Sequence, residues 1–435
     1  MQHILVFDRS FFVLLALQAP LLAELARRFI NPSSFFLLTS DVFIFLIFIL
    51  IARKTLVRYW GYQIVILLAL MCFSILSAIV NDLPASLIYV GTRPFVMGFI
   101  SAVLGYYFIE SGRGIYRLIW VVTFWSALIT GYAILQIVLG IDHPINILPE
   151  GTGDAGQGIG YHSETGASMF GLFRPTSIFF HTGKFGQVAF FMALIPALFF
   201  LSKSRDYSLF LRLLTVLGFV AVFASGQRAA FVFVIITLAV YLLRMGRISS
   251  VVRAVAIGLA ILAIPVWLGG SDLVANIGER YAQLDKATTG RLVNNSSVFF
   301  DVLDDSGILG QGVGMYSFGA GSFAVKMDFV TEHSWIRLLA EWGVLGLLVV
   351  LFFLLSVLFS CTMRSRYRMK EFSSDILRFA SISIALSLAM WSFTHDVIGN
   401  TLTMQIAFTV FGVTRGWIVY QHHKALAENR LRTVV

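Results

Sequence analysis

The sequence predicts an all-α integral membrane protein with about twelve transmembrane helices. Of its 435 residues, 58% are hydrophobic and only 13% are charged, and the mean hydropathy is +0.85. A soluble protein of this length could not bury so much apolar surface. The apolar residues recur in runs of about 17 to 23 residues, which are long enough to cross a bilayer as helices.

The expected spans follow one another along the whole chain. They are predicted near residues 10–27, 36–52, 60–80, 86–108, 118–139, 184–202, 209–225, 229–243, 253–269, 334–360, 377–394 and 400–420. Pro20 and Glu24 interrupt the first run, which is therefore the least regular. No basic segment or small-residue cleavage site marks the N-terminus, so we expect no cleaved signal peptide.

Alternate loops between these spans are rich in Lys and Arg, which the positive-inside rule assigns to the cytoplasm. These loops and the tail hold Arg53, Lys54, Arg58, Arg113, Arg117, Lys203, Arg205, Arg212, Arg244, Arg247, Arg253, Arg364, Arg366, Arg368, Lys370, Lys424, Arg430 and Arg432. Arg27 and Arg28 fall on the opposite side. The net charge of +9 therefore follows from membrane topology and indicates no nucleic-acid partner.

This topology divides the chain into five segments. Residues 1–139 form the N-terminal transmembrane helices, 184–269 the central ones, and 334–435 the C-terminal helices and cytoplasmic tail. Two long loops, 140–183 and 270–333, face away from the cytoplasm and carry four of the eight histidines. An enzyme of this topology would place its site there, among the polar residues.

Few basic residues fall on the outward side, and each needs a reason to be there, such as binding an anion. They are Arg93, Arg174, Lys184, Arg228, Arg280, Lys286, Arg291, Lys326 and Arg337. Arg174 precedes the 184–202 span, Arg228 ends a tight turn between two spans, and Arg291 begins a segment that could form an amphipathic surface helix. Guanidinium groups that converge on one site could hold a diphosphate. The simpler interpretation is that Arg228 snorkels to lipid phosphates and that Lys184 is solvated.

His333 is the strongest candidate for proton transfer, because it lies where the second long loop meets a span and an imidazole titrates near neutral pH. Arg337 and Glu341 follow at helical spacing and share one face. Pairing of these two is the expected reason for the intramembrane carboxylate. His181 is a second candidate, and His395 with Asp396 a third. The alternative for His333 is a purely structural role at the helix start.

Other motifs carry weaker signals. The glycine-rich segment 307–314 lacks the lysine and spacing of a phosphate-binding loop, so we interpret it as a turn packed closely at the membrane. The two cysteines, Cys72 and Cys361, lie in separate spans and predict neither a disulfide nor a metal site. No nucleotide, haem or metal-ligand spacing is present, so we expect a mechanism without a metal or other cofactor.

The motif His-Ser-x-x-x-x-Leu-x-Glu-x-Gly-x-x-Gly at 333–346 resembles the O-antigen ligase and polymerase superfamily. The turn Ser225-x-x-Arg228 and Gly290-Arg291 fit other blocks of that superfamily, over about residues 60 to 420. Arg174-x-x-Ser177-x-Phe179 is similar to a block of polysaccharide polymerases. The resemblance implies a GT-C-type fold in the bacterial inner membrane, with the two long loops in the periplasm.

The resemblance also implies a function. His333 takes the catalytic position and Arg228 and Arg291 hold the pyrophosphate of an undecaprenyl-pyrophosphate-linked glycan, with Arg174 as a further contact; Arg337, Glu341, His181 and Lys184 are supporting candidates. A polymerase would transfer this glycan to an acceptor sugar with inversion, whereas an O-antigen ligase would transfer it to lipid A–core. Flippase and chain-length regulator proteins are the expected partners. Glycosylation of a protein, a transporter of lipid-linked glycan and a structural scaffold remain as alternatives.

Overall fold

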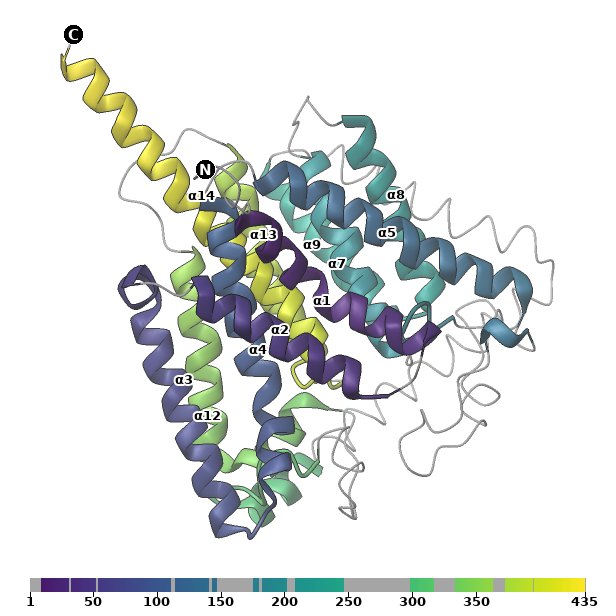
Figure 1. The fold of residues 1–435 in the computed structure, drawn as a ribbon. Coiled ribbons are helices and arrows are strands. Elements are labelled where there is room, and N and C mark those ends of the chain that lie inside the picture. The colour runs from purple at the N-terminus through teal and green to yellow at the C-terminus, as the bar shows by residue number, and fades with distance from the viewer. Residues whose placement is uncertain are drawn as a thin grey trace, which may run out of the picture. The chain divides into compact units, whose positions relative to one another are not determined.

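The computed structural model describes residues 9–30, 33–51, 54–110, 114–140, 143–146, 175–179, 182–201, 208–245, 298–316, 333–362, 372–393 and 395–434. Within these ranges every regular element is helical (Figure 1). They are α1 (Arg9–Phe29), α2 (Phe35–Ile51), α3 (Lys54–Val80), α4 (Ala85–Glu110), α5 (Gly114–Leu139), the 3-10 turn η1 (Pro144–Asn146), α7 (Thr182–Leu201), α8 (Ser208–Ser225), α9 (Arg228–Arg244), α12 (Ser334–Thr362), α13 (Phe372–Trp391) and α14 (Thr401–Val434). The prediction of an all-α protein is confirmed for this part of the chain.

Helices coincide with every predicted span except 253–269, which lies outside the described residues. Six of the described helices are long and apolar enough to cross a membrane: Ser10–Phe29, Trp60–Val80, Ala85–Ile109, Trp120–Leu139, Ser334–Thr362 and Thr401–Lys424. Shorter apolar helices cover Phe35–Ile51, Gly183–Phe199, Leu211–Ser225 and Ala229–Arg244. The chain is therefore a helical membrane protein. Pro20 and Glu24 do not interrupt α1, where Glu24 pairs with Arg27 at 3.4 Å.

The chain forms two compact units. The first contains Met1–Phe124 and Asp305–Val435, and the second contains Trp125–Asp304. The first unit therefore joins the two ends of the sequence, and it holds α1 to α4 together with α12, α13 and α14.

In the first unit, α4 and α14 pack along each other through small residues. A Cβ atom at Gly105 of α4 would lie 2.7 Å from the Thr409 carbonyl oxygen of α14, and one at Gly416 would lie 2.5 Å from the Tyr106 carbonyl oxygen. Glycine lets helix backbones approach this closely in a membrane, where packing drives association. The Phe408 ring of α14 then stacks on Phe353 of α12 at 6.0 Å, so α12 joins the same core.

Turns that the topology places on one side of the membrane meet at one end of this unit. The side-chain amide of Asn81 donates to the Gly310 carbonyl at 3.3 Å. The backbone amide of Ser334 donates to the His395 carbonyl at 3.4 Å. At the opposite end, Arg415 donates to the Ser360 carbonyl at 2.7 Å. The predicted alternation of loops is thus consistent with the packing of the first unit.

The second unit contains the C-terminal part of α5 with α7, α8 and α9. A Cβ atom at Gly218 of α8 would lie 2.5 Å from the Ala193 Cα atom of α7, so these two helices are also in close backbone contact. The Thr130 hydroxyl of α5 donates to the Leu217 carbonyl of α8 at 3.4 Å. This unit positions the turn that precedes Arg228.

Candidate functional site

His333 lies at the first turn of α12, as the sequence predicts. Its carbonyl oxygen accepts a hydrogen bond from the Arg337 amide at 3.0 Å, so it begins the helix, and its side chain is partly exposed. An imidazole in this place reaches the boundary between helix and loop. This is the position at which the sequence predicts a group for proton transfer.

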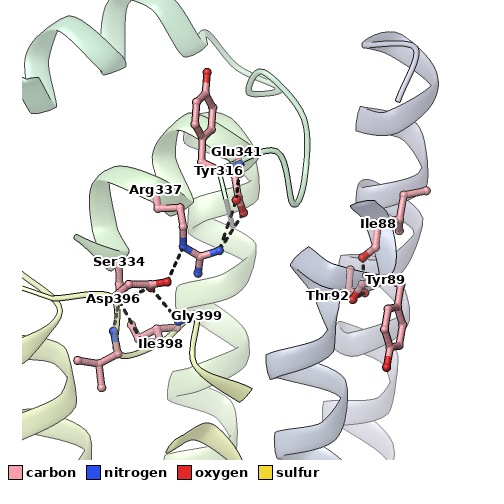
Figure 2. Close-up of polar contacts among 11 residues, drawn as sticks. Ile88, Tyr89, Thr92, Tyr316, Ser334, Arg337, Glu341, Asp396, Ile398 and Gly399 are labelled. Atoms are coloured by element: carbon pink, nitrogen blue, oxygen red, sulfur yellow. Dashed lines mark hydrogen bonds and ion pairs between the residues drawn. The ribbon is translucent and has the colours of Figure 1, made fainter. Parts of the chain in front are cut away.

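Arg337 lies one turn further along α12, between two carboxylates (Figure 2). Its Nη1 atom is 3.2 Å from Glu341 Oε2, and its Nε atom is 3.2 Å from Asp396 Oδ2. All three side chains are buried. The expected pairing of Arg337 with Glu341 is confirmed, and Asp396 is a second partner. Its charge is thus matched within the protein, which favours a supporting role over direct phosphate binding.

Ser334 ties this helix start to the turn that joins α13 and α14. Its hydroxyl is 2.9 Å from Asp396 Oδ1 and accepts hydrogen bonds from the amides of Val397, at 2.8 Å, and Ile398, at 3.0 Å. The Gly399 amide donates to Asp396 Oδ1 at 3.0 Å (Figure 2). The residue that follows His333 is therefore fixed by several contacts. Asp396 thus contacts Ser334 and Gly399 through Oδ1 and Arg337 through Oδ2.

The glycine-rich segment 307–314 packs against helices, which confirms the interpretation as a close turn. A Cβ atom at Gly91 of α4 would lie 2.6 Å from the Gly314 amide nitrogen. Just after this turn, the Tyr316 amide donates to Glu341 Oε1 at 3.0 Å. The buried Glu341 carboxylate thus contacts both Arg337 and Tyr316, which is the last residue of the described segment 298–316 in the second long loop.

A second buried ion pair lies between α2 and α4. Arg93 Nε is 2.5 Å from Asp41 Oδ2, and Nη2 is 3.3 Å from Oδ1. The Tyr89 hydroxyl donates to the same Asp41 oxygen at 2.5 Å. Arg93 is one of the outward basic residues for which the sequence suggested an anion. That anion is a carboxylate of the protein itself.

In the second unit, Arg228 is the first residue of α9 and follows the tight turn that the sequence predicts. Gly226 adopts φ 62°, and the Gln227 amide donates to the Ser225 hydroxyl at 3.2 Å. A Cβ atom at Gly186 of α7 would lie 2.7 Å from Gln227 Cβ. This contact brings the turn next to the start of α7, which carries Lys184 two residues earlier.

The Arg-x-x-Ser-x-Phe block is anchored to α5 in the same unit. The Ser177 amide donates to Gln136 Oε1 at 2.7 Å, and its hydroxyl donates to the Ile129 carbonyl at 2.7 Å. Phe179 is fully buried. Three predicted site residues, Arg174, His181 and Arg291, lie outside the described residues.

The part of the chain that the structure describes contains no group of three or more His, Cys, Asp or Glu side chains placed to hold a metal ion. What it does contain is His333 at the start of a helix whose next turns hold buried ion pairs. The sequence indicated Asp396 only as a third candidate for proton transfer, with His395. Its contacts with Arg337 and Ser334 are the main feature that the sequence did not reveal. Comparison with known families and with curated proteins gives no matching family model and no matching protein.

Proposed function

We propose that this protein is a polymerase of a bacterial surface polysaccharide, either O-antigen or exopolysaccharide. It would have twelve transmembrane helices in a GT-C-type fold in the inner membrane, with its site at the periplasmic face. The donor would be a glycan linked to undecaprenyl pyrophosphate, and the acceptor a sugar hydroxyl of another lipid-linked glycan.

One observation carries the proposal. A histidine lies at the mouth of a membrane helix, and the next turns of that helix are held by buried ion pairs. Burying three charged side chains is costly unless they are mutually satisfied, so such a cluster at this position favours a functional role over a structural one. The resemblance of residues 333–346 to the superfamily motif supports the same function.

The proposed reaction is a single displacement at the anomeric carbon. His333 takes the proton of the acceptor hydroxyl, and the oxygen forms a bond to the anomeric carbon. The bond from that carbon to the pyrophosphate oxygen breaks, and undecaprenyl pyrophosphate leaves with the electron pair. Arg228, Arg291 and Arg174 would bind the pyrophosphate and stabilise its charge. The product has inverted anomeric configuration, and no cofactor takes part.

The test is transfer by purified protein supplied with a lipid-linked repeat unit from its host, with products analysed by mass spectrometry. A ladder of longer lipid-linked chains without another acceptor supports the polymerase. Transfer only after lipid A–core is added identifies a ligase instead. Absence of transfer under both conditions contradicts the proposal and favours a transporter of lipid-linked glycan.

A substitution tests the role of His333 in the same assay. His333→Ala is expected to abolish turnover and to leave binding of the lipid-linked donor intact, because the imidazole moves a proton and does not hold the phosphates. His143→Ala, at an exposed histidine of the first outward loop, is the matched control and should behave like the wild type. Turnover of His333→Ala near the wild-type rate contradicts the assignment.

Arg228 has its own test. Arg228→Lys is expected to weaken donor binding about tenfold or more, because a lysine cannot form two parallel bonds to a phosphate. Arg244→Lys, at the other end of α9, is the control and should bind the donor normally. If Arg228→Lys binds the donor as tightly as the wild type does, Arg228 does not bind the pyrophosphate, and the simpler interpretation that it snorkels to lipid phosphates holds.

A further inference from the structure

The helix that follows His333 is broken. Gly343 has φ 63° and ψ −173°, which are not helical angles, and it separates residues 334–342 from the rest of α12. We call residues 334–342 the outer half-helix. It carries Arg337 and Glu341 and begins one residue after His333, so its orientation determines that of the histidine backbone.

The turn 307–312 replaces the hydrogen bonds that the break removes. In a continuous helix the Val344 and Leu345 amides would donate to the carbonyls of Ala340 and Glu341. Instead, these two amides donate to Gly307 and Ile308 at 3.3 and 3.2 Å. The two carbonyls accept from the Gln311 and Gly312 amides at 2.8 and 3.2 Å. Four bonds thus take the place of two, and the broken backbone is satisfied at membrane depth.

Close contact between two glycines makes this arrangement possible. A Cβ atom at Gly310 would lie 2.5 Å from the Gly343 nitrogen, and one at Gly343 would lie 2.5 Å from the Ile308 carbonyl oxygen. Both residues also have positive φ values, 74° for Gly310 and 63° for Gly343. The break and the turn are therefore one local structure, and neither forms without the other.

Glu341 is the side chain that joins this local structure to the ion pairs. Its Oε1 atom accepts the Tyr316 amide at 3.0 Å, and its Oε2 atom lies 3.2 Å from Arg337 Nη1. The Tyr316 hydroxyl in turn contacts Gln311 Oε1. The carboxylate is fully buried, so no water competes for these contacts. It links the turn 307–316, within the second long loop, to the helix face that follows His333.

We infer that Glu341 is a positioning residue for the reaction proposed above. Acting through Arg337 and the Tyr316 amide, it fixes the outer half-helix, and with it His333, against the turn 307–316. This inference rests on the proposed function. Glu341 touches no reacting atom; it sets the place from which His333 reaches the acceptor.

The test compares Glu341→Gln with Asp41→Asn. Glutamine keeps the shape and an oxygen for the Tyr316 amide but loses the charge that holds Arg337. Asp41 is an equally buried carboxylate paired with an arginine of another helix, which makes it the matched control for lost stability. We expect Glu341→Gln to lower kcat about 10- to 100-fold with an unchanged KM for the lipid-linked donor, whereas Asp41→Asn keeps its kcat.

Equal losses of kcat in the two variants, or a wild-type kcat in Glu341→Gln, would overturn the inference. If Glu341→Gln does not fold, Glu341→Asp is the second variant, because it keeps the charge but shortens the side chain that reaches both Arg337 and the Tyr316 amide. It is expected to lower kcat by a smaller factor and to leave KM unchanged. A wild-type kcat in Glu341→Asp would then count against the inference.

A second measurement separates this inference from the proposed function. Hydrogen–deuterium exchange of the 334–342 amides is expected to be faster in Glu341→Gln than in Asp41→Asn or the wild type. If the wild type transfers no glycan, the proposed function fails, yet the exchange rates still show whether Glu341 orders the outer half-helix. If the exchange rate of these amides in Glu341→Gln equals that of the wild type, Glu341 does not order the outer half-helix.

Discussion

Arg337 is buried and Arg93 is partly buried in the same unit, and their charges are neutralised in different ways. The Arg337 side chain is 2% exposed and lies between Glu341 and Asp396. The Arg93 side chain is 20% exposed and forms its ion pair with Asp41, through two of its nitrogen atoms. Both arginines lie near helix ends that the topology places on the outward side.

The balance of charge separates the two clusters. Arg93 and Asp41 form a neutral pair, which is the least costly way to keep an arginine within a membrane helix. Arg337 has two carboxylate partners, so its cluster has a formal charge of −1 when both are ionised. Excess buried charge lowers stability, and stability alone does not explain its presence. We therefore expect a structural role for the Arg93 pair, and the excess charge supports the functional role proposed for the cluster beside His333.

The largest expected effect is that of removing the shared arginine. Arg337→Met leaves Glu341 and Asp396 buried and facing one another, which should cost about 3–5 kcal/mol of the free energy of unfolding. Arg93→Met leaves only Asp41, which still accepts the Tyr89 hydroxyl, so its cost should be smaller. Unfolding of both variants in mixed micelles with increasing SDS measures the difference. Equal losses of unfolding free energy in the two variants would mean that the second carboxylate partner of Arg337 does not affect stability.

Much of the fold follows from hydropathy and charge, because each span is a local signal. The pairing of Arg337 with Glu341 was also predictable, since residues four apart lie on one helix face. Asp396 was not, because it approaches Ser334 from 62 residues away. Asp41 and Arg93 are likewise 52 residues apart. Such pairs depend on how helices are arranged, and hydropathy does not specify that arrangement.

The break in α12 was also hidden from the sequence. Gly343 lies within an apolar run that predicts one uninterrupted span, and glycine is common in membrane helices. Its positive φ is sustained by Gly307 to Gly312, a segment that a glycine-rich composition identifies only as a turn. The sequence showed a glycine-rich turn and a glycine within a span, but it showed neither the break nor its contact with the turn.

A smaller effect is expected from crowding the glycine contact beside the Arg337 cluster. Gly310→Ala places a methyl group against the Gly343 backbone and strains a positive φ, which should cost about 2–3 kcal/mol. Gly307→Ala is the matched control, because Gly307 has φ 58° but open space around its Cβ position. The same SDS unfolding should show a smaller loss for the control. Equal losses would attribute the effect to φ strain alone.

For the neutral Asp41–Arg93 pair, we expect that replacing both residues together has little effect on stability. Asp41→Leu alone leaves the Arg93 charge unpaired and should cost about 2–3 kcal/mol, whereas Asp41→Leu with Arg93→Met should return to within about 1 kcal/mol of the wild type. The double-mutant cycle measures the coupling energy of the pair. Glycan transfer should be retained in the double variant. Loss of transfer with normal stability would contradict the structural role assigned to this pair.

The smallest effect is expected from the hydroxyl of Tyr89. Tyr89→Phe removes one hydrogen bond to Asp41 and should lower the free energy of unfolding by about 1 kcal/mol, because the ring is partly exposed and the ion pair survives. Tyr62→Phe, at an exposed tyrosine of α3, should be neutral. In the Asp41→Leu background the effect of Tyr89→Phe should vanish, since its acceptor is gone. In the Arg337→Met background it should persist unchanged, because the two clusters share no side chain. If the effect of Tyr89→Phe on the free energy of unfolding changes in the Arg337→Met background, the two clusters are energetically coupled.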